Sequence, residues 1–489
     1  MALVWTVFIG AVAALGLFTL GMLAAMPIID KWLVNLTFDR LLAALVDTRY
    51  TQNLGSVLSL VRRSGAQTGI ENMIRATKAS AISRPMGTPL QLSHWEHLMF
   101  SPAQVARFPT ASRQRLDTTV TLGPAADKPL KCAMPILITG MSYGGALSAE
   151  TKVALARGAT EAGTATNTGE SYLPAERDAA RRLIVQYHRG TWPLSAQNHP
   201  EWLEKADAIE IQIGQGAQAA AEMRTSHRRI SPEMRSTFGL EEGEDAVIAA
   251  RLRGVDTPEE LVQLISRLKR RYPVPVGIKI AVGTRLREDL EALLEGHPDF
   301  LVLDGGEGGT HGGPPILQDD FGLPLIAAVP WADQILRDHG VRHDVSLIAA
   351  GGLRTPGQFL KAIALGADAV YVGFAALMAM ASSQASRVLP WAPPEALFYE
   401  SGASKHALDT VQAAQSLANY LKSCNEELKY GLQALGYTRL DQVSRQDLFA
   451  LDPWTAAVTG VAPLGPQGPD FTPAHPSKAS RQQEETVLH

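Results

Sequence analysis

Residues 345–373 read VSLIAAGGLRTPGQFLKAIALGADAVYVG, and this stretch decides the fold. An apolar run ends at Gly351 and Gly352, the segment TPGQFLKAIALGA follows with helical period, and a second apolar run ends at Gly373. The threonine and proline that open the middle segment are typical of a helix start. A strand, a helix and a second strand in this order predict one unit of a parallel sheet.

The same rhythm extends from about residue 113 to residue 379. Its apolar runs are PILITG (135–140), TATNTG (164–169), LIVQY (183–187), AIEIQIG (208–214), PVGIKIA (275–281), DFLVLDGG (299–306), VSLIAAGG (345–352) and AVYVG (369–373). About eight such units favour an α/β fold of the (β/α)8 TIM-barrel type. An open, doubly wound sheet is the alternative, but no G-x-G-x-x-G follows the first strand.

Charge and cysteine content exclude several classes of function. The 489 residues include 45 Lys and Arg against 49 Asp and Glu, a net charge of −4, which gives no electrostatic case for nucleic acid. The two cysteines, Cys132 and Cys424, cannot form a disulfide framework, a four-cysteine metal site or an iron–sulfur cluster. We therefore expect neither a metal nor an iron–sulfur centre.

Residues 1–29 carry no charged side chain and are long enough to cross a bilayer as a helix. We interpret them as a retained transmembrane anchor, with a buried apolar helix as the alternative. Lys31 and Arg40 follow the run, and the positive-inside rule then places the rest of the chain in the cytoplasm. The sequence thus predicts a single-pass protein of the inner or plasma membrane with a cytoplasmic catalytic domain.

The remaining boundaries follow from composition and periodicity. We expect a helical and loop-like extension over 30–112, the barrel over 113–395, a helical extension over 396–460 and a disordered tail, rich in proline and polar residues, over 461–489.

Glycines gather where a barrel binds phosphate. Such sites commonly form after the seventh and eighth strands, here at Gly351, Gly352 and Gly373. Glycine lets the backbone approach an anion without a Cβ atom in the way, and the helix after Gly373 offers free N–H groups. The stretch LDGGEGGTHGGPP (303–315) ends the preceding strand and faces the same rim. Ordinary glycine-rich turns are the alternative interpretation.

Five motifs in this order resemble the FMN-binding synthase domain of glutamate synthases. They are MSYGGALSAETKVALARGATEAGTATNTGES, IEIQIGQGAQ, GIKIAVG, LDGGEGGTHGGP and AAGGLRTPGQFLKAIALGADAVYVGFAAL, and together they span about half of the chain. The chain is also similar to the stand-alone, membrane-anchored members of that family. The resemblance implies a barrel that holds FMN.

The resemblance also implies positions for the cofactor. The expected cofactor-binding residues are Gly351, Gly352, Gly373 and Phe374 at the phosphate, Gly305, Gly306 and Gly309 nearby, Met141, Ser142 and Tyr143 under the ring, and Lys279 at its pyrimidine side. An inward lysine at a strand end is costly without a negative partner, and a reduced flavin supplies one near N1. A structural pair between Lys279 and a barrel carboxylate is the alternative.

The implied reaction is hydride transfer from reduced FMN to 2-iminoglutarate, formed from 2-oxoglutarate and ammonia, which gives L-glutamate. Lys279, Glu170 and Gln215 would be the catalytic residues, with Glu170, Gln215 and Gln218 on the substrate side. Gln218 departs from the family pattern, because it replaces a lysine that pairs with a substrate carboxylate. The candidate substitutes are Arg224, Arg228, Arg229, Arg251 and Arg253.

The expected partners are a keto-acid or amino-acid substrate, the membrane through residues 1–29, and an external electron donor, which the anchor suggests is membrane-bound. Two other functions stay open at this point. One is an amino-acid oxidoreductase with a different substrate, and the other is a flavin-binding, membrane-tethered subunit of a larger complex.

Overall fold

The computed structural model describes residues 25–26, 29–49 and 55–464, which belong to two compact units, Met1–Ile82 and Ser83–His489. In the first unit a helical stretch covers 29–47, and α2 (Gly55–Ser64) and α3 (Ala66–Lys78) follow it. The predicted disordered tail lies outside the described residues, apart from 461–464.

The predicted membrane localisation requires correction. Most of residues 1–29 lie outside the described part of the chain. Within the described part, no helix is both long and apolar enough to span a bilayer. The stretch 29–47 carries five charged side chains, and α2 and α3 have 10 and 13 residues, whereas a span needs about 20 apolar residues. The single-pass localisation and the membrane contact are therefore withdrawn.

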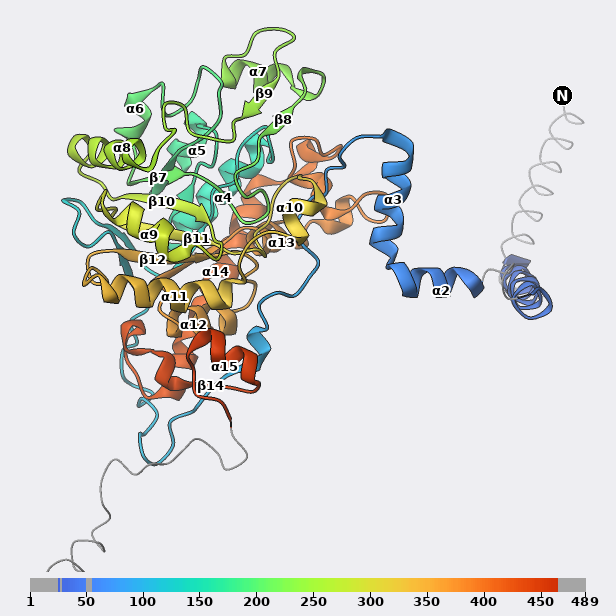
Figure 1. Cartoon of the computed structure of the whole chain (residues 1–489). Coiled ribbons are helices and arrows are strands. Elements are labelled where there is room, and N and C mark those ends of the chain that lie inside the picture. The colour runs from blue at the N-terminus through green and yellow to red at the C-terminus, as the bar shows by residue number, and fades with distance from the viewer. Residues whose placement is uncertain (1–24, 27–28, 50–54, 465–489) are drawn as a thin grey trace, which may run out of the picture. The chain divides into compact units, whose positions relative to one another are not determined.

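The second unit contains an eight-stranded parallel barrel (Figure 1). Its strands are β4 (Ile136–Ile138), β5 (Thr166–Asn167), β6 (Leu183–Tyr187), β7 (Ala208–Gln212), β10 (Val276–Ala281), β11 (Phe300–Asp304), β12 (Ser346–Ala350) and β13 (Ala369–Val372). They neighbour one another in chain order, and β13 pairs with β4. The N–H of Ile138 donates to the carbonyl of Ala165 at 3.0 Å, which joins the first strand to the second. The predicted barrel is thus confirmed over the open sheet.

Helices follow the strands as the periodicity predicts. They are α4 (Ala149–Ala162), α5 (Pro174–Ala179), α6 (Pro200–Leu203), α8 (Pro258–Arg271), α9 (Leu286–Leu294), α11 (Leu325–Asp338), α12 (Pro356–Ala364) and α13 (Phe374–Ser382). The capping box of Thr257 and Glu260 starts α8, and Thr355 caps α12. The long helix α14 (Thr410–Leu435) packs against α4, where a Cβ atom on Gly158 would lie 2.8 Å from Leu417.

Shorter elements complete this unit. They are β1 (Leu98–Phe100) paired with β14 (Leu448–Ala450), β2 (Val120–Leu122) paired with β3 (Leu130–Cys132), β8 (Met223–Thr225) paired with β9 (Ala246–Ile248), and the helices α7 (Pro232–Phe238), α10 (Pro315–Asp319) and α15 (Pro453–Thr459). The hairpin β2–β3 closes the amino-terminal end of the barrel, because Leu122 and Leu130 pack with Leu137 and Phe300 in its interior.

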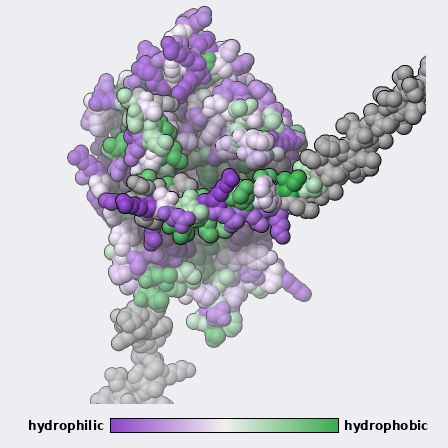
Figure 2. Space-filling view, turned by 90° about the vertical axis from the view of Figure 1, so that its right-hand side faces the viewer, coloured by the Kyte–Doolittle hydropathy of each residue, from purple (hydrophilic) through white to green (hydrophobic). Residues whose placement is uncertain are grey.

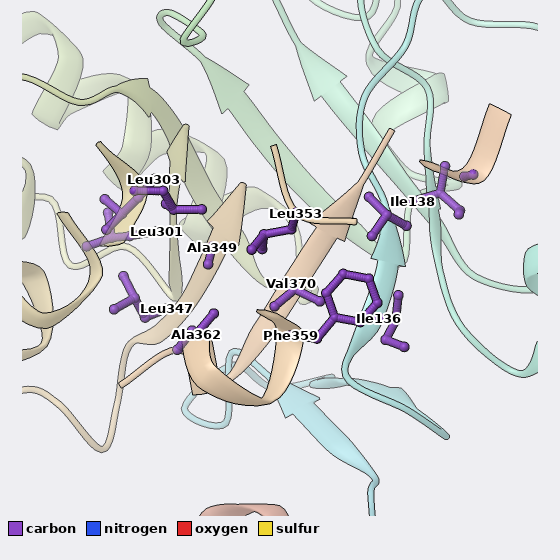
Figure 3. Close-up of a cluster of buried hydrophobic side chains, with 14 of the residues drawn as sticks. Ile136, Ile138, Leu301, Leu303, Leu347, Ala349, Leu353, Phe359, Ala362 and Val370 are labelled. Carbon is purple, nitrogen blue, oxygen red and sulfur yellow. The ribbon is translucent and has the colours of Figure 1, made fainter. Parts of the chain in front are cut away.

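Side chains along each barrel strand alternate between two hydrophobic cores, one between the strands and the helices and one inside the barrel. Leu301 and Leu303 of β11 face the surrounding helices and pack in one cluster with Phe359 of α12 (Figure 3). Val302, between them, fills the barrel interior together with Ile348 of β12. Side chains on a strand alternate between its two faces, so every second residue points into the barrel. These inward residues are apolar in the middle of the barrel and polar near the carboxyl ends of the strands.

Candidate active site

The inward positions near the carboxyl ends of the strands form a buried polar layer. Its members are Asn167, Gln186, Glu210, Gln212, Lys279, Asp304 and Tyr371, each at most 5% exposed. Glu210 accepts hydrogen bonds from Gln186 Nε2 (2.7 Å) and from the hydroxyl of Tyr371 (2.8 Å). Buried charges of this kind need partners, and here the partners come from several different strands.

Lys279 forms a buried ion pair across two neighbouring strands. Its Nζ atom lies 2.8 Å from Oδ2 of Asp304, with 3% and 7% of the two side chains exposed, and 3.5 Å from Oγ1 of Thr139. Burial alone would lower the pKa of the Lys279 ammonium, but the charges of Asp304 and Glu210 raise this pKa above its ordinary value. The ion pair between Lys279 and a barrel carboxylate, which is the alternative predicted from the sequence, is therefore present. The ammonium has three N–H donors, so it keeps capacity to bind a ligand as well.

The first strand end is held by a second buried lysine. Lys152 Nζ donates to the carbonyls of Met141 (2.7 Å), Asn167 (3.0 Å) and Thr168 (3.0 Å), and it pairs with Glu176 at 2.8 Å. These three hydrogen bonds and the ion pair of Lys152 hold the backbone at the ends of the first two strands.

Met141, Ser142 and Tyr143, predicted to lie under the flavin ring, form an irregular segment after β4, and the turn 144–146 follows them. Ser142 is partly exposed, and its carbonyl accepts from the N–H of Leu147 at 2.9 Å. The ring of Tyr143 packs edge-on against Phe238 in a separate apolar cluster. The N–H of Tyr143 donates to Ser171 Oγ at 2.7 Å and its carbonyl accepts from the N–H of Gly145 at 2.8 Å, so both the ring and the backbone of Tyr143 already have partners within the chain.

The predicted phosphate glycines lie at adjoining strand ends. Gly351 and Gly352 have φ values of +113° and +70°, which disfavour any other residue. A Cβ atom on Gly351 would lie 2.9 Å from the backbone nitrogen of Gly305. Gly373 is the N-cap of α13, which has no side-chain cap, and Phe374 begins that helix. Gly305, Gly351 and Gly373 thus follow three neighbouring strands, and the N-terminus of α13 beside them has no side-chain cap, an arrangement typical of an anion-binding site.

Other glycines of the stretch 303–315 have a packing role. A Cβ atom on Gly306 would lie 3.2 Å from Leu92, and one on Gly309 would lie 3.2 Å from the carbonyl oxygen of Met86. Gly306 and Gly309 thus let the loop lie against the segment that precedes the barrel. Within this stretch, Gly305 is the predicted glycine that meets the β12 turn.

The predicted substrate residues lie on loops after β5 and β7. Glu170 is 7% exposed, and its Oε1 atom has no hydrogen-bond partner among the described residues. Burial raises the pKa of the Glu170 carboxyl, and the positive charges of Arg189 and Lys279 oppose that rise. Glu170 and Lys279 are thus close enough for their charges to interact.

Gln215 and Gln218 share one tight turn. The N–H of Gln218 donates to the carbonyl of Gln215 at 3.1 Å, and the N–H of Gln215 donates to the carbonyl of Ala219 at 3.0 Å. Gln218 Nε2 donates to Oγ1 of Thr310 at 2.7 Å, which ties the turn to the glycine loop. The side chain of Gln215 is partly exposed.

Sequence reasoning missed Arg189, which is buried beside this turn. All five arginines proposed as substitutes for the missing lysine are exposed, and Arg224 and Arg251 pair with nearby carboxylates. Figure 2 agrees, since the end of the molecule with β8, β9 and α7 is mostly hydrophilic. The sequence could have identified Arg189, because it follows the strand LIVQY by two residues. Residues just after the carboxyl end of a barrel strand lie at the barrel mouth.

Comparison with known proteins gives the family. A model described as the conserved region in glutamate synthase matches residues 84–438. The chain is 32% identical to a glutamate synthase large subunit-like protein of Rhizobium meliloti (strain 1021), covering 83% of this chain and 93% of that protein. It is 33% identical to an archaeal-type glutamate synthase [NADPH] of Thermotoga maritima, covering 71% of this chain and 69% of that protein.

A solved structure of an oxidized active mutant of (S)-mandelate dehydrogenase matches with a TM-score of 0.47 and 17% identity over 72% of this chain and 88% of that chain. The chain belongs to the glutamate synthase family, within the conserved region that its members share.

Proposed function

We propose that this glutamate synthase-type oxidoreductase holds FMN and reduces 2-iminoglutarate, formed from 2-oxoglutarate and ammonia, to L-glutamate. The observation that carries the proposal is the buried Lys279 of β10, paired with Asp304, at the same end of the barrel as the glycines that follow β11, β12 and β13. A fixed ammonium and glycine-rich strand ends in one barrel mouth suit a cofactor that carries charge at both ends.

The residues present fit FMN. Gly351, Gly352, Gly373 and Phe374 would hold the phosphate through backbone N–H groups, and Lys279 would neutralise the negative charge of the reduced ring. Four buried polar atoms in the barrel mouth have no partner among the described residues: Glu170 Oε1, Arg189 Nη2, Gln212 Nε2 and Gln218 Oε1. Unpaired buried polar groups destabilise a fold, and they are kept mainly where a bound ligand supplies the missing hydrogen-bond partner.

When bound, reduced FMN would supply a hydride to the imine carbon of the substrate. The chain's own residues would position that substrate and move its protons. Burial raises the pKa of Glu170, so its carboxyl holds a proton to higher pH than an exposed glutamate and would pass it to or from the nitrogen. Gln215 would orient the substrate from its turn, and electrons would come from an external donor.

Anaerobic reoxidation of the purified protein tests this function. The flavin, identified by visible absorbance and release on denaturation, is reduced chemically and then mixed with 2-oxoglutarate and ammonium. We expect rapid return of the oxidised spectrum together with L-glutamate, but neither without ammonium. Lys279→Met should lose most of the reoxidation, and because it leaves the buried Asp304 carboxylate unpaired, an unfolding transition of the variant is measured alongside. A colourless protein, or a reduced flavin that no keto acid and ammonium reoxidise, contradicts the proposal.

A further inference from the structure

Arg189 presents an unused hydrogen-bond donor inside the site. The residue lies just after β6 and is 2% exposed. Its Nε atom donates to Gln212 Oε1 (3.3 Å), and Nη1 donates to the carbonyls of Ala220 (2.9 Å) and Ala249 (3.0 Å). Nη2 has no hydrogen-bond partner among the described residues. Since a guanidinium stays protonated, this side chain keeps both a full charge and a free N–H pair.

No carboxylate of the described residues lies within ion-pair distance of Arg189, although buried arginines usually have such a partner. Burial lowers the pKa of Arg189 and the charge of Glu170 opposes that shift, but the Glu170 Oε1 atom has no hydrogen-bond partner in the described part of the chain. Gln212, which accepts from Arg189 Nε, also has a donor, Nε2, that is unpaired within the described chain, so a negative ligand at this position would accept from both side chains.

Arg189 supplies a cation near residue 218. The family resemblance implies a lysine at that position, paired with a substrate carboxylate, whereas Gln218 is neutral. Arg189 reaches the same turn, since its Nη1 atom bonds the carbonyl of Ala220, two residues beyond Gln218. A guanidinium binds a carboxylate through two parallel hydrogen bonds, so it can replace an ammonium from a different strand.

We propose that Arg189 binds the second carboxylate of a dicarboxylic substrate, in place of the lysine that Gln218 replaces. The inference rests on the proposed function for the identity of the site, and it selects acidic keto acids over those with an apolar side chain. Arg189 acts here as a binding and specificity residue. A purely structural role, in which it only holds the Ala220 and Ala249 loops, is the competing explanation.

Ligand binding separates the two explanations without turnover. The flavin-loaded protein is titrated calorimetrically with glutarate, a dicarboxylate that cannot react, and with pentanoate, which has the same chain length and one carboxylate. We expect saturable glutarate binding that Arg189→Gln weakens about 10- to 100-fold, the usual effect of losing a charge-assisted hydrogen bond. Pentanoate binding should be at least tenfold weaker than glutarate in the wild type and should change little in the variant.

A restoring variant guards against misfolding. Adding Gln218→Lys to Arg189→Gln should recover most of the glutarate affinity, because the ammonium returns to the turn from the other side. Arg251→Gln, an exposed arginine of the same region, should leave both titrations unchanged. Equal loss of glutarate and pentanoate in Arg189→Gln, without recovery in the double variant, would show a structural role and overturn the inference.

The outcomes also separate this inference from the proposed function. Glutarate binding that depends on Arg189, in a protein that makes no L-glutamate, rejects the function and keeps the carboxylate site. Turnover of 2-oxoglutarate that is unchanged in Arg189→Gln keeps the function and rejects the role of Arg189. Absence of glutarate binding in the wild type rejects the carboxylate site.

Discussion

The ammonium of Lys279 lies 2.8 Å from the Asp304 carboxylate, and both side chains are almost completely buried in the barrel. The pair joins the fifth strand to the sixth at the mouth of the barrel. Burial lowers the pKa of Lys279, and Asp304 contributes the largest opposing charge, ahead of Glu210, so the protonation of this cation depends most on Asp304. This dependence makes the pair testable by pH.

Asp304→Asn should move the alkaline limb of the kcat/KM profile to lower pH. Burial lowers the pKa of Lys279 and the Asp304 carboxylate raises it. Without that carboxylate the pKa falls, so Lys279 loses its proton at a lower pH. A shift of about one pH unit would correspond to about 1.4 kcal/mol. The matched control is Asp299→Asn, which removes the carboxylate of a pair with Lys269 at the other end of the barrel, also at 2.8 Å. An unshifted limb in Asp304→Asn would argue against a catalytic ammonium.

Glu170→Gln should lower kcat by about 10²- to 10⁴-fold, the usual contribution of a general acid or base. Because the pKa of Glu170 is raised, its carboxyl stays protonated to higher pH than an exposed glutamate, and acid catalysis should decline as the pH rises through that value. Glu170→Gln should lose this limb of the pH profile while it keeps bound flavin. Glu204→Gln, at an exposed position, serves as the control. Full activity in Glu170→Gln would remove Glu170 from proton transfer.

Gly352→Ala should destabilise the protein by about 1–3 kcal/mol and reduce its flavin content. Gly352 has a φ of +70°, and an added Cβ atom would lie 2.6 Å from the Cβ atom of Glu307. Gly357→Ala, five residues later, meets nothing within 4 Å on the exposed face of α12 and should gain up to about 1 kcal/mol. Denaturant unfolding and flavin absorbance measure both effects, and equal behaviour of the two variants would refute the proposed tight turn.

Lys152→Met should lower the unfolding free energy by about 3–5 kcal/mol, because it leaves Glu176 as an uncompensated carboxyl with 0% exposure. Burial already raises the pKa of Glu176 to about 7 with the lysine in place. Adding Glu176→Leu should recover part of the loss, while the three carbonyls that Lys152 bonded stay without a donor. Lys205→Met at an exposed position should change stability by less than about 0.5 kcal/mol.

The eight strands and the capped helices were predictable because their signals are local. Apolar alternation and the caps at Thr257 and Thr355 depend on residues a few positions apart. The inward lysine of GIKIA was predictable for the same reason. The localisation inferred from residues 1–29 rested on composition alone, and the described helices gave it no support.

The sequence by itself determined the barrel, its family and the inward direction of Lys279, since these depend on residues close together in the chain. Only the tertiary structure decided the partners. Barrel closure placed Asp304 beside Lys279, and loop packing turned Gly306 and Gly309 toward the segment before the barrel. Closure also buried Arg189 while the five arginines of the neighbouring loops stayed exposed. These relationships join residues far apart in the chain, and their distances depend on how the strands and loops pack in three dimensions.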